Sequence, residues 1–518
     1  MAPPDPCSRV FHFSSTVKNK RGCIENKWNG PGKGHACPSQ SRPCARANNA
    51  IPEKDSRTEP ECGQVSDSKA TQEQALGLLD DLVHRAVRAG ADAADAVLID
   101  GTSLSLAVRK GALEKLEQAE GGDIGLRVLV GTRQALVSSA DRSGPALSEL
   151  VDRALAMARA VPEDPLIGLA EPGQIARSLP DIDGAASGDV DQETLRALAL
   201  DLENAARSVE GVTNSEGAEA SFSRSMVSLV ASNGFAQAYP MTRIGMGVAV
   251  IAGDSTTGME FDYATRSTVH PEDLVAPADL GREAGEGAVR KLGARRMTTG
   301  ERTVVFDPRT ARSLLGHFLS AINGSSIVRG TSFLKDALGT AVFGSGVSIV
   351  EDPLRRRGLL SRPCDAEGLP TRSRTLVENG VLTTWLLDLR SARALGMEPT
   401  GHASRSTGSA PHPAPSNVWL APGPLSPEEL IADIRDGLYV TSLAGQGVNS
   451  LTGDYSRGAS GFRIENGVLT TPVHEITVAG NLRDMFAALT PASDLAFHYG
   501  TDAPTVRIER MMVAGEQA

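Results

Sequence analysis

The chain has 518 residues, of which 40% are hydrophobic and 22% are charged. This length exceeds what a single hydrophobic core supports, so two folded domains are expected. The net charge of -11 disfavours nucleic acid as a partner, because the chain would repel a polyanion. No apolar run approaches the length of about 20 residues that a helix needs to cross a bilayer, and no signal-peptide pattern opens the chain. We therefore expect a cytoplasmic protein without a membrane partner.

Residues 1–70 are rich in Pro, Ser, Asn, Gly and basic side chains and show no hydrophobic periodicity. Such a segment cannot offset its ordering entropy by burial, so we predict a disordered extension, which a start codon assigned too far upstream would also explain. Five of the six cysteines lie in this segment, and Cys364 is the exception. Their intervals are irregular and include no CxxC pair, so neither a disulfide scaffold nor a zinc site is predicted.

An N-terminal α/β domain is predicted over residues 71–295. Apolar residues recur at intervals of three and four over 71–90, as in an amphipathic helix, and Asp191 is the predicted N-cap of a later helix. Short β-like runs separated by glycines predict a meander of strands. The expected helices are 71–90, 145–160, 191–209 and 271–291, and the expected strands are 96–100, 103–109, 124–130, 134–139, 226–231 and 246–252.

A β-rich C-terminal domain is predicted over residues 296–518. It begins with a strand at 303–306 and a helix at 311–322, and strands and turns then dominate. Asn379-Gly380 and Asn466-Gly467 each lie between apolar alternations, a strong hairpin signal because type I′ turns need positive φ at both positions. The predicted fold class is therefore α+β, with an N-terminal α/β domain of meandering strands and long helices followed by a β-rich domain.

Common catalytic motifs are absent from the sequence. The HExxH zinc motif, the GxSxG nucleophile elbow, the phosphate loop and the GxGxxG fingerprint do not occur. His474-Glu475 begins the zinc motif, but Val478 follows at the second ligand position and the alternation indicates a strand, so a surface His-Glu pair is expected. His402 and His412 flank a loop rich in Ser, Gly and Pro, where solvent exposure is a better expectation than a shared metal.

Several strings together resemble the TldD/PmbA (TldE) metallopeptidase family, and its PmbA/TldE branch in particular. The resemblance covers roughly residues 71–515. The strings are SLAVRKGALE at 105–114, GLRV at 125–128, GDYSRGASGF at 453–462 with the following ENG turn, and ITVAGNL at 476–482.

This resemblance implies a cytosolic heterodimer in which TldD and TldE subunits pair and degrade or trim unfolded peptides. It implies that zinc lies on the TldD-type partner, where an HExxxH helix supplies two histidine ligands and the general base. The equivalent stretch here is 314–321, in which Gly316 and Ala321 replace the histidines and His317 stands where the glutamate would be. Catalytic zinc needs about three protein ligands, so no metal ligand and no catalytic residue is predicted in this chain.

Asp454, Tyr455, Arg457 and His317 are candidates for lining a peptide cleft. The alternatives are a structural ion pair within the 454–457 turn and a packing role for His317. Asn481 is expected to cap a helix that begins near Leu482. The predicted function is that of a PmbA/TldE-like subunit without its own zinc. The alternatives are a self-sufficient metallopeptidase with an unrecognised site from His317, His402, His412 or His474, and a peptide-binding module without catalysis.

Overall fold

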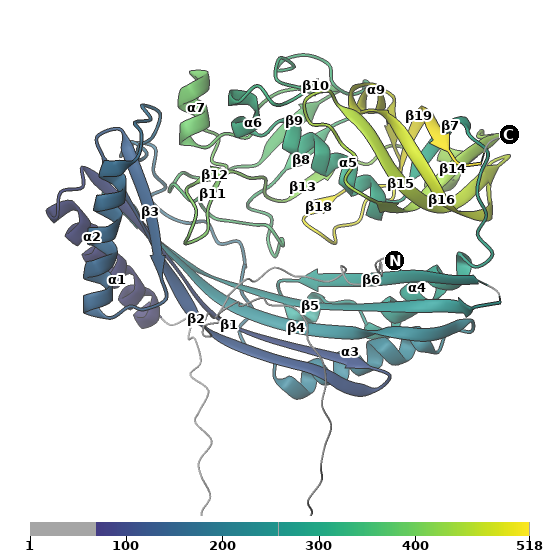
Figure 1. Ribbon diagram of the computed structural model, residues 1–518, viewed down its shortest axis with the longest axis horizontal. Coiled ribbons are helices and arrows are strands. Elements are labelled where there is room, and N and C mark those ends of the chain that lie inside the picture. The colour runs from purple at the N-terminus through teal and green to yellow at the C-terminus, as the bar shows by residue number, and fades with distance from the viewer. Residues whose placement is uncertain (1–68, 257, 517–518) are drawn as a thin grey trace, which may run out of the picture. The chain divides into compact units, whose positions relative to one another are not determined.

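The computed structural model of the protein describes residues 69–256 and 258–516 (Figure 1). The extension predicted over residues 1–70 therefore lies almost wholly outside the described residues, and the first helix, α1, begins at Lys69. None of the helices in the described ranges is long and apolar enough to span a membrane. The α+β fold class is confirmed, whereas the domain boundary predicted near residue 295 stays a prediction.

A six-stranded antiparallel sheet occupies the N-terminal half, in the order β3-β2-β1-β4-β5-β6. The two short strands predicted at 96–100 and 103–109 are one strand, β1. Gly101 does not interrupt it, because a Cβ there would lie 2.4 Å from the carbonyl oxygen of Arg224 on β4, so glycine permits the two backbones to approach. The strands are β1 Ala93–Arg109, β2 Ala112–Val130, β3 Arg133–Ser139, β4 Val212–Ala231, β5 Ala236–Asp254 and β6 Gly258–Thr268.

Helices α1 Lys69–Arg88, α2 Gly144–Ala160, α3 Gln192–Arg207 and α4 Pro277–Arg290 cover one face of this sheet (Figure 1). Even-numbered β1 residues such as Leu98 and Leu106 pack beneath them. Because side chains alternate along a strand, odd-numbered residues face the other way, and Asp95 there contacts Arg405 from the C-terminal half. Asp191 caps α3 as predicted, by accepting from the Thr194 amide. The helix predicted over 271–291 is shorter, since a 3-10 turn precedes Pro277.

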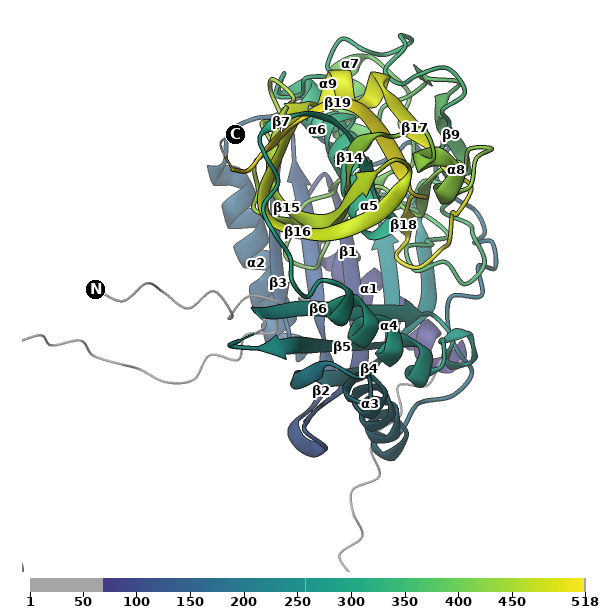
Figure 2. The same cartoon turned by 90° about the vertical axis from the view of Figure 1, so that its right-hand side faces the viewer.

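A five-stranded closed barrel organises the C-terminal half. Its strands run β16-β15-β14-β7-β19, and pairing between β16 and β19 closes the ring, which Figure 2 shows from one end. Both predicted Asn-Gly turns are confirmed, with φ of 48° and 84° at Asn379-Gly380 and of 51° and 78° at Asn466-Gly467. The barrel strands are β7 Gly300–Phe306, β14 Asp436–Ala444, β15 Asp454–Glu465, β16 Val468–Asn481 and β19 Val506–Ala514, with β17 Leu489–Pro491 beside β19.

Helix α5, Pro308–Ala321, lies at the centre of the largest hydrophobic core, which joins the barrel to a smaller sheet of order β10-β9-β8-β13-β18. The remaining elements are short. They are α6 Gly324–Val328, α7 Leu389–Leu395, α8 Pro427–Ile431, α9 Leu482–Ala487, β8 Ile349–Glu351, β9 Arg374–Glu378, β10 Val381–Leu382, β11 Ala403–Ser404, β12 His412–Pro413, β13 Val418–Leu420 and β18 Thr501–Asp502.

Candidate functional site

Helix α5 presents one polar stripe and buries the rest of its surface. Asp307 caps its N-terminus by accepting from the Thr310 amide. Pro308 at the first helical position also favours a helix start there, because its φ is fixed near the helical value and its missing N–H would have no partner within the helix. Its apolar side chains face the core, while Gly316 and His317 are partly exposed and Ser320 is exposed. The helix therefore offers a single imidazole to any ligand.

The residues of α5 do not fit a catalytic zinc ion. Gly316 has no side chain, and no atom lies within 4 Å of the place where a Cβ would stand. Ala321 is 4% exposed and packs in the core without a donor atom. Across residues 69–256 and 258–516, no three His, Cys, Asp or Glu side chains converge as metal ligands would.

The structure brings three of the four predicted cleft residues together. The ring of His317 on α5 meets the ring of Tyr455 on β15 edge to face, with centroids 6.0 Å apart. Arg457 follows Tyr455 by two positions and lies on the same face of β15, close enough to shift the pKa of both rings. These residues form a cluster, His317/Tyr455/Arg457, that we call the α5–β15 cluster.

Polar atoms of the α5–β15 cluster lack partners. The Tyr455 hydroxyl, His317 Nε2 and Arg457 Nε are buried and make no hydrogen bond within the described part of the chain. Burial raises the pKa of Tyr455 to about 12, although Arg457 opposes the shift, so the phenol remains protonated at neutral pH. Burial, aided by Arg457, lowers the pKa of His317. At neutral pH the cluster therefore presents a phenol, a neutral imidazole and one positive charge.

Asp454 does not belong to this cluster. It is exposed on the opposite face of β15, where its carboxylate accepts from the Thr452 hydroxyl at 2.6 Å and from Asn481 Nδ2 at 3.1 Å. The partners of Asp454 are thus Thr452 and Asn481, and the ion pair with Arg457 that the sequence offered as an alternative does not form. Asn481 also accepts from the Arg483 amide and caps α9, as predicted.

His402 is buried, which corrects the expectation that it is solvent-exposed. Its Nε2 lies 2.5 Å from Glu351 Oε2, and its Nδ1 lies 2.7 Å from the Thr400 hydroxyl. The other Glu351 oxygen accepts from the Ser416 amide and hydroxyl. Although burial opposes ionisation, these contacts hold the pKa of Glu351 below its usual value. Each polar atom of His402 has a partner inside the protein, so its role is structural.

The other histidines lie in separate surroundings. His412 is exposed, as expected. His474 lies on strand β16, as the alternation predicted, but its nearby carboxylate is Glu260 at 3.3 Å, whereas Glu475 pairs with Arg296. Because each histidine has different neighbours, the four scattered histidines do not combine into one site.

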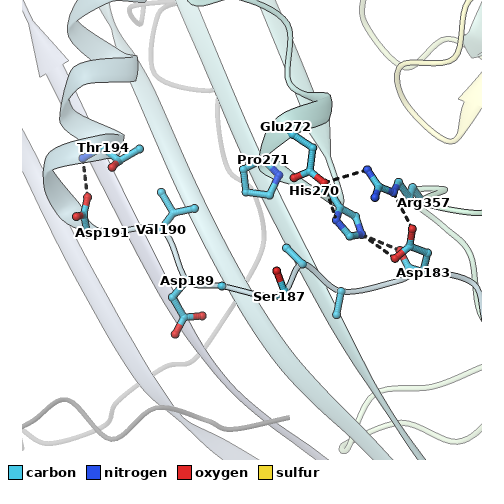
Figure 3. A pocket seen from close by; sticks show the side chains of 13 residues that line it. Asp183, Ser187, Asp189, Val190, Asp191, Thr194, His270, Pro271, Glu272 and Arg357 are labelled. Atoms are coloured by element: carbon cyan, nitrogen blue, oxygen red, sulfur yellow. Dashed lines mark hydrogen bonds and ion pairs between the residues drawn. The ribbon is translucent and has the colours of Figure 1, made fainter.

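A polar pocket of about 530 Å³ lies elsewhere, between the segment that leads into α3 and the turn after β6 (Figure 3). No feature of the sequence pointed to it. Its acidic side chains already have partners: Asp189 pairs with Arg224, and Asp191 caps α3. The full lining is Asp183, Ala185, Ala186, Ser187, Gly188, Asp189, Val190, Asp191, Thr194, His270, Pro271, Glu272 and Arg357.

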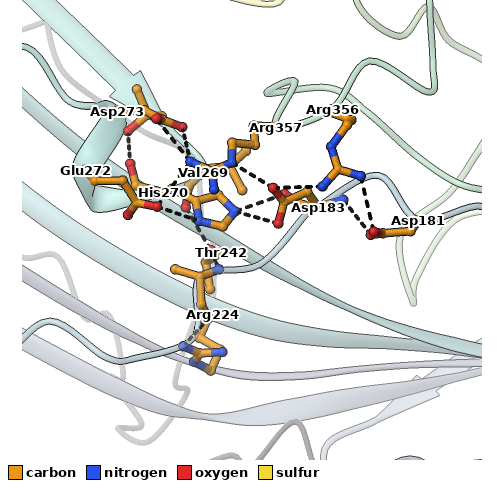
Figure 4. A network of polar contacts seen from close by, with 12 residues as sticks. Asp181, Asp183, Arg224, Thr242, Val269, His270, Glu272, Asp273, Arg356 and Arg357 are labelled. Atoms are coloured by element: carbon orange, nitrogen blue, oxygen red, sulfur yellow. Dashed lines mark hydrogen bonds and ion pairs between the residues drawn. The ribbon is translucent and has the colours of Figure 1, made fainter.

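A charge network closes one end of this pocket (Figure 4). The ring of His270 lies 3.3 Å from carboxylate oxygens of both Asp183 and Glu272. Arg357 reaches Asp183 at 2.7 Å and Asp273 at 3.1 Å, and its hydrogen bond to Asp183 is the main cause that lowers the pKa of that carboxyl. Arg357, the last of three consecutive arginines, thereby joins segments that are distant in the chain.

Replacement of Arg357 by Gln is expected to lower stability more than replacement of Arg356 by Gln. Arg357 contacts three carboxylates at 36% exposure, whereas Arg356 contacts two at 63% exposure, and exposed ion pairs contribute only about 0–1 kcal/mol. Thermal unfolding of both variants measures the difference. Equal midpoints for the two variants would show that the network adds nothing beyond an ordinary surface pair.

Models of one protein family match most of the described chain in three consecutive blocks. The PmbA/TldA metallopeptidase domain 1 matches residues 94–158, the central domain matches 186–292, and the C-terminal domain matches 299–515. The Asp454–Arg457 string and helix α5 both lie in the third block.

Curated relatives and solved structures agree with these matches. The chain is 35% identical to "Metalloprotease PmbA" of Escherichia coli O157:H7, over 82% of this chain and 93% of that protein. It is 34% identical to "Metalloprotease PmbA homolog" of Haemophilus influenzae, over 86% and 97%. A crystal structure titled a putative modulator of DNA gyrase, from Bacteroides thetaiotaomicron, superposes with a TM-score of 0.78 at 25% identity, over 87% and 100%.

TldE from Thermococcus kodakarensis has the same fold, with a TM-score of 0.75 at 19% identity, over 85% of this chain and all of that one. The fold, the three consecutive family matches and the identity to PmbA relatives across their length lead to one assignment. This chain belongs to the PmbA/TldD (TldE) metallopeptidase family.

Proposed function

We propose that this chain is the TldE-type subunit of a cytosolic heterodimeric metallopeptidase that degrades or trims unfolded peptides, and that a TldD-type partner holds the catalytic zinc. The observation that carries the proposal is the composition of α5. Neither Gly316 nor Ala321 has an atom that can bind zinc, and His317 is left without a second histidine on its helix.

The contribution of this chain to the reaction is then to bind and orient the peptide. Holding an extended peptide in place lowers the entropic part of the barrier, and a closed surface around the zinc excludes folded proteins. The α5–β15 cluster supports this role, because polar side chains without internal partners are typical of surfaces that meet a ligand.

The test is the zinc content and the peptidase activity of the full chain, measured alone and after mixing with a TldD-type partner. We expect the purified chain to hold less than stoichiometric zinc and to leave an unfolded peptide intact, and we expect cleavage to appear on mixing. Zinc content is measured by elemental analysis after dialysis, and cleavage by mass spectrometry of the products.

Two other outcomes would replace the proposal. Stoichiometric zinc together with cleavage by the isolated chain would make it a self-sufficient metallopeptidase and would require a site that α5 does not supply. Peptide binding without cleavage in either sample would make it a binding module, provided that the partner cleaves the same peptide with a cognate subunit.

A further inference from the structure

The α5–β15 cluster contains hydrogen-bonding groups that the protein itself leaves unused. The Tyr455 side chain is 1% exposed, and its hydroxyl, His317 Nε2 and Arg457 Nε each lack a hydrogen bond of normal geometry among the described residues, although Arg457 lies close enough to Tyr455 to oppose the rise of its pKa. Burying a polar group without a hydrogen bond is unfavourable, so three of them in one place indicate that something outside the chain completes the arrangement.

Arg457 also lacks a carboxylate, although acidic residues outnumber basic ones by 63 to 52 in the chain. The other arginine of β15, Arg463, contacts Asp436 at 2.9 Å and Glu465 at 3.0 Å. The barrel residue Arg507 likewise contacts Glu509 at 2.6 Å. Arg457 has no such contact in the described ranges, so its charge is available to an anionic ligand.

The chemistry of the cluster selects an acceptor rather than a metal ion. A guanidinium and a protonated phenol donate hydrogen bonds, and a neutral imidazole can donate from Nε2. The positive charge of Arg457 disfavours a cation in the same place. A carboxylate has two acceptor oxygens and a full negative charge, and arginine binds carboxylates through two parallel hydrogen bonds.

The place beside the cluster at Gly316 is open. Gly316 precedes His317 on α5, and the place of its missing Cβ has no atom within 4 Å. His317 and Arg457 are partly exposed, so the cluster meets solvent. Asp454, three positions before Arg457, lies on the opposite face of β15 and accepts hydrogen bonds from Thr452 and Asn481, so it does not compete for Arg457.

We propose that His317, Tyr455 and Arg457 form a binding site for a peptide carboxylate, supplied by the C-terminus of the peptide or by an acidic side chain. The proposal rests on the proposed function for the peptide as ligand, and it adds the chemical group that anchors that peptide. Arg457 provides the charge, and the Tyr455 hydroxyl and His317 Nε2 direct hydrogen bonds to the oxygens.

The test uses the full chain and fluorescence anisotropy with N-terminally labelled, unstructured peptides. One peptide has no acidic residue and a free C-terminus, the second is its C-terminal amide, and the third is the amide with one internal Glu. We expect about 10–100-fold tighter binding for a peptide with a carboxylate than for the uncharged amide, because hydrogen bonds to charged groups contribute about 1.5–3 kcal/mol. Whichever of the first and third peptides binds more tightly identifies the source of the carboxylate, the C-terminus or the Glu side chain.

Three variants test whether residues of the α5–β15 cluster cause the preference for a carboxylate. Arg457→Gln is expected to reduce the affinity for the carboxylate peptide to that for the amide, and Tyr455→Phe to weaken it less. Arg463→Gln is the matched control, because Arg463 lies on the same strand but its charge is already paired with carboxylates of the chain. Thermal unfolding midpoints for all three verify that the barrel is intact, and Tyr455→Phe keeps the ring in the core.

Equal affinity for the three peptides, or equal loss in Arg457→Gln and Arg463→Gln, would overturn the carboxylate site. Absence of binding by the wild-type chain at millimolar peptide would overturn it as well. In either case the proposed function would stand or fall separately, on whether mixing with the partner produces cleavage.

Discussion

Replacing Asp95 with Asn is expected to destabilise the protein by about 3–5 kcal/mol, because removal of one partner leaves buried charges uncompensated. Asp95 is 4% exposed and lies between two arginines that are equally buried, Arg127 on β2 and Arg405 in the loop between β11 and β12. Burial opposes its ionisation, yet the two guanidiniums together hold the pKa of Asp95 below its usual value. Asn would keep the shape and remove the charge.

The measurement is the thermal and urea unfolding midpoint of Asp95→Asn beside that of Asp100→Asn. Asp100 lies on the same strand and also binds an arginine, Arg142, but both side chains are about one-third exposed. Exposed pairs contribute about 0–1 kcal/mol, so this control should change little. If the two variants have the same unfolding midpoints, the buried contact between Asp95 and the loop that contains Arg405 is not a major source of stability.

Local signals in the sequence predicted much of the secondary structure. Asp191 capped its helix because a carboxylate accepts from the N3 amide whatever surrounds it, and the two Asn-Gly turns formed because few other residues adopt positive φ at both positions. The lengths of the strands were harder to predict from the sequence. Gly101 looked like a break in the pattern, but it lies inside β1 where the neighbouring backbone comes close.

Long-range pairing could not be predicted from the same signals. Closure of the barrel depends on the pairing of β16 with β19, in which Val478 lies opposite Val513, and alternation within either strand does not specify this pairing. The buried pair of His402 with Glu351 joins residues 51 positions apart, so His402 looked like a loop residue. The partners of Arg357 likewise lie in segments far away in the sequence, so no local pattern predicts its contacts.

The candidate site was partly predictable. Tyr455 and Arg457 belong to a distinctive string and share a face of β15 by simple alternation, and His317 was singled out by the helix that resembles a zinc-binding one. Alternation also places Asp454 on the other face. His317 meets Tyr455 only because α5 packs against β15 inside one core. The two residues are more than 130 positions apart, so only the fold reveals this contact.

Two of the three glycines in the same string, Gly458 and Gly461, should respond very differently to replacement by Ala. A Cβ at Gly461 would lie 1.9 Å from the Tyr439 carbonyl oxygen and 3.0 Å from the Val440 Cα, both backbone atoms of β14. Real atoms cannot approach so closely, and a barrel strand paired on both sides cannot move freely. Overpacking costs about 1–3 kcal/mol, and a backbone clash places Gly461→Ala near the upper end, about 3 kcal/mol.

Gly458→Ala is the matched control on the same strand. Its Cβ would stand 3.5 Å from the Ala444 side chain, an ordinary contact, so its unfolding midpoint should remain close to that of the wild-type chain. Because Gly461 holds β15 in register with β14, its replacement should also displace Tyr455 from His317 and weaken peptide binding together with stability. If Gly461→Ala unfolds like Gly458→Ala, β14 and β15 separate easily, and the glycine is not required by the close approach of the two strands.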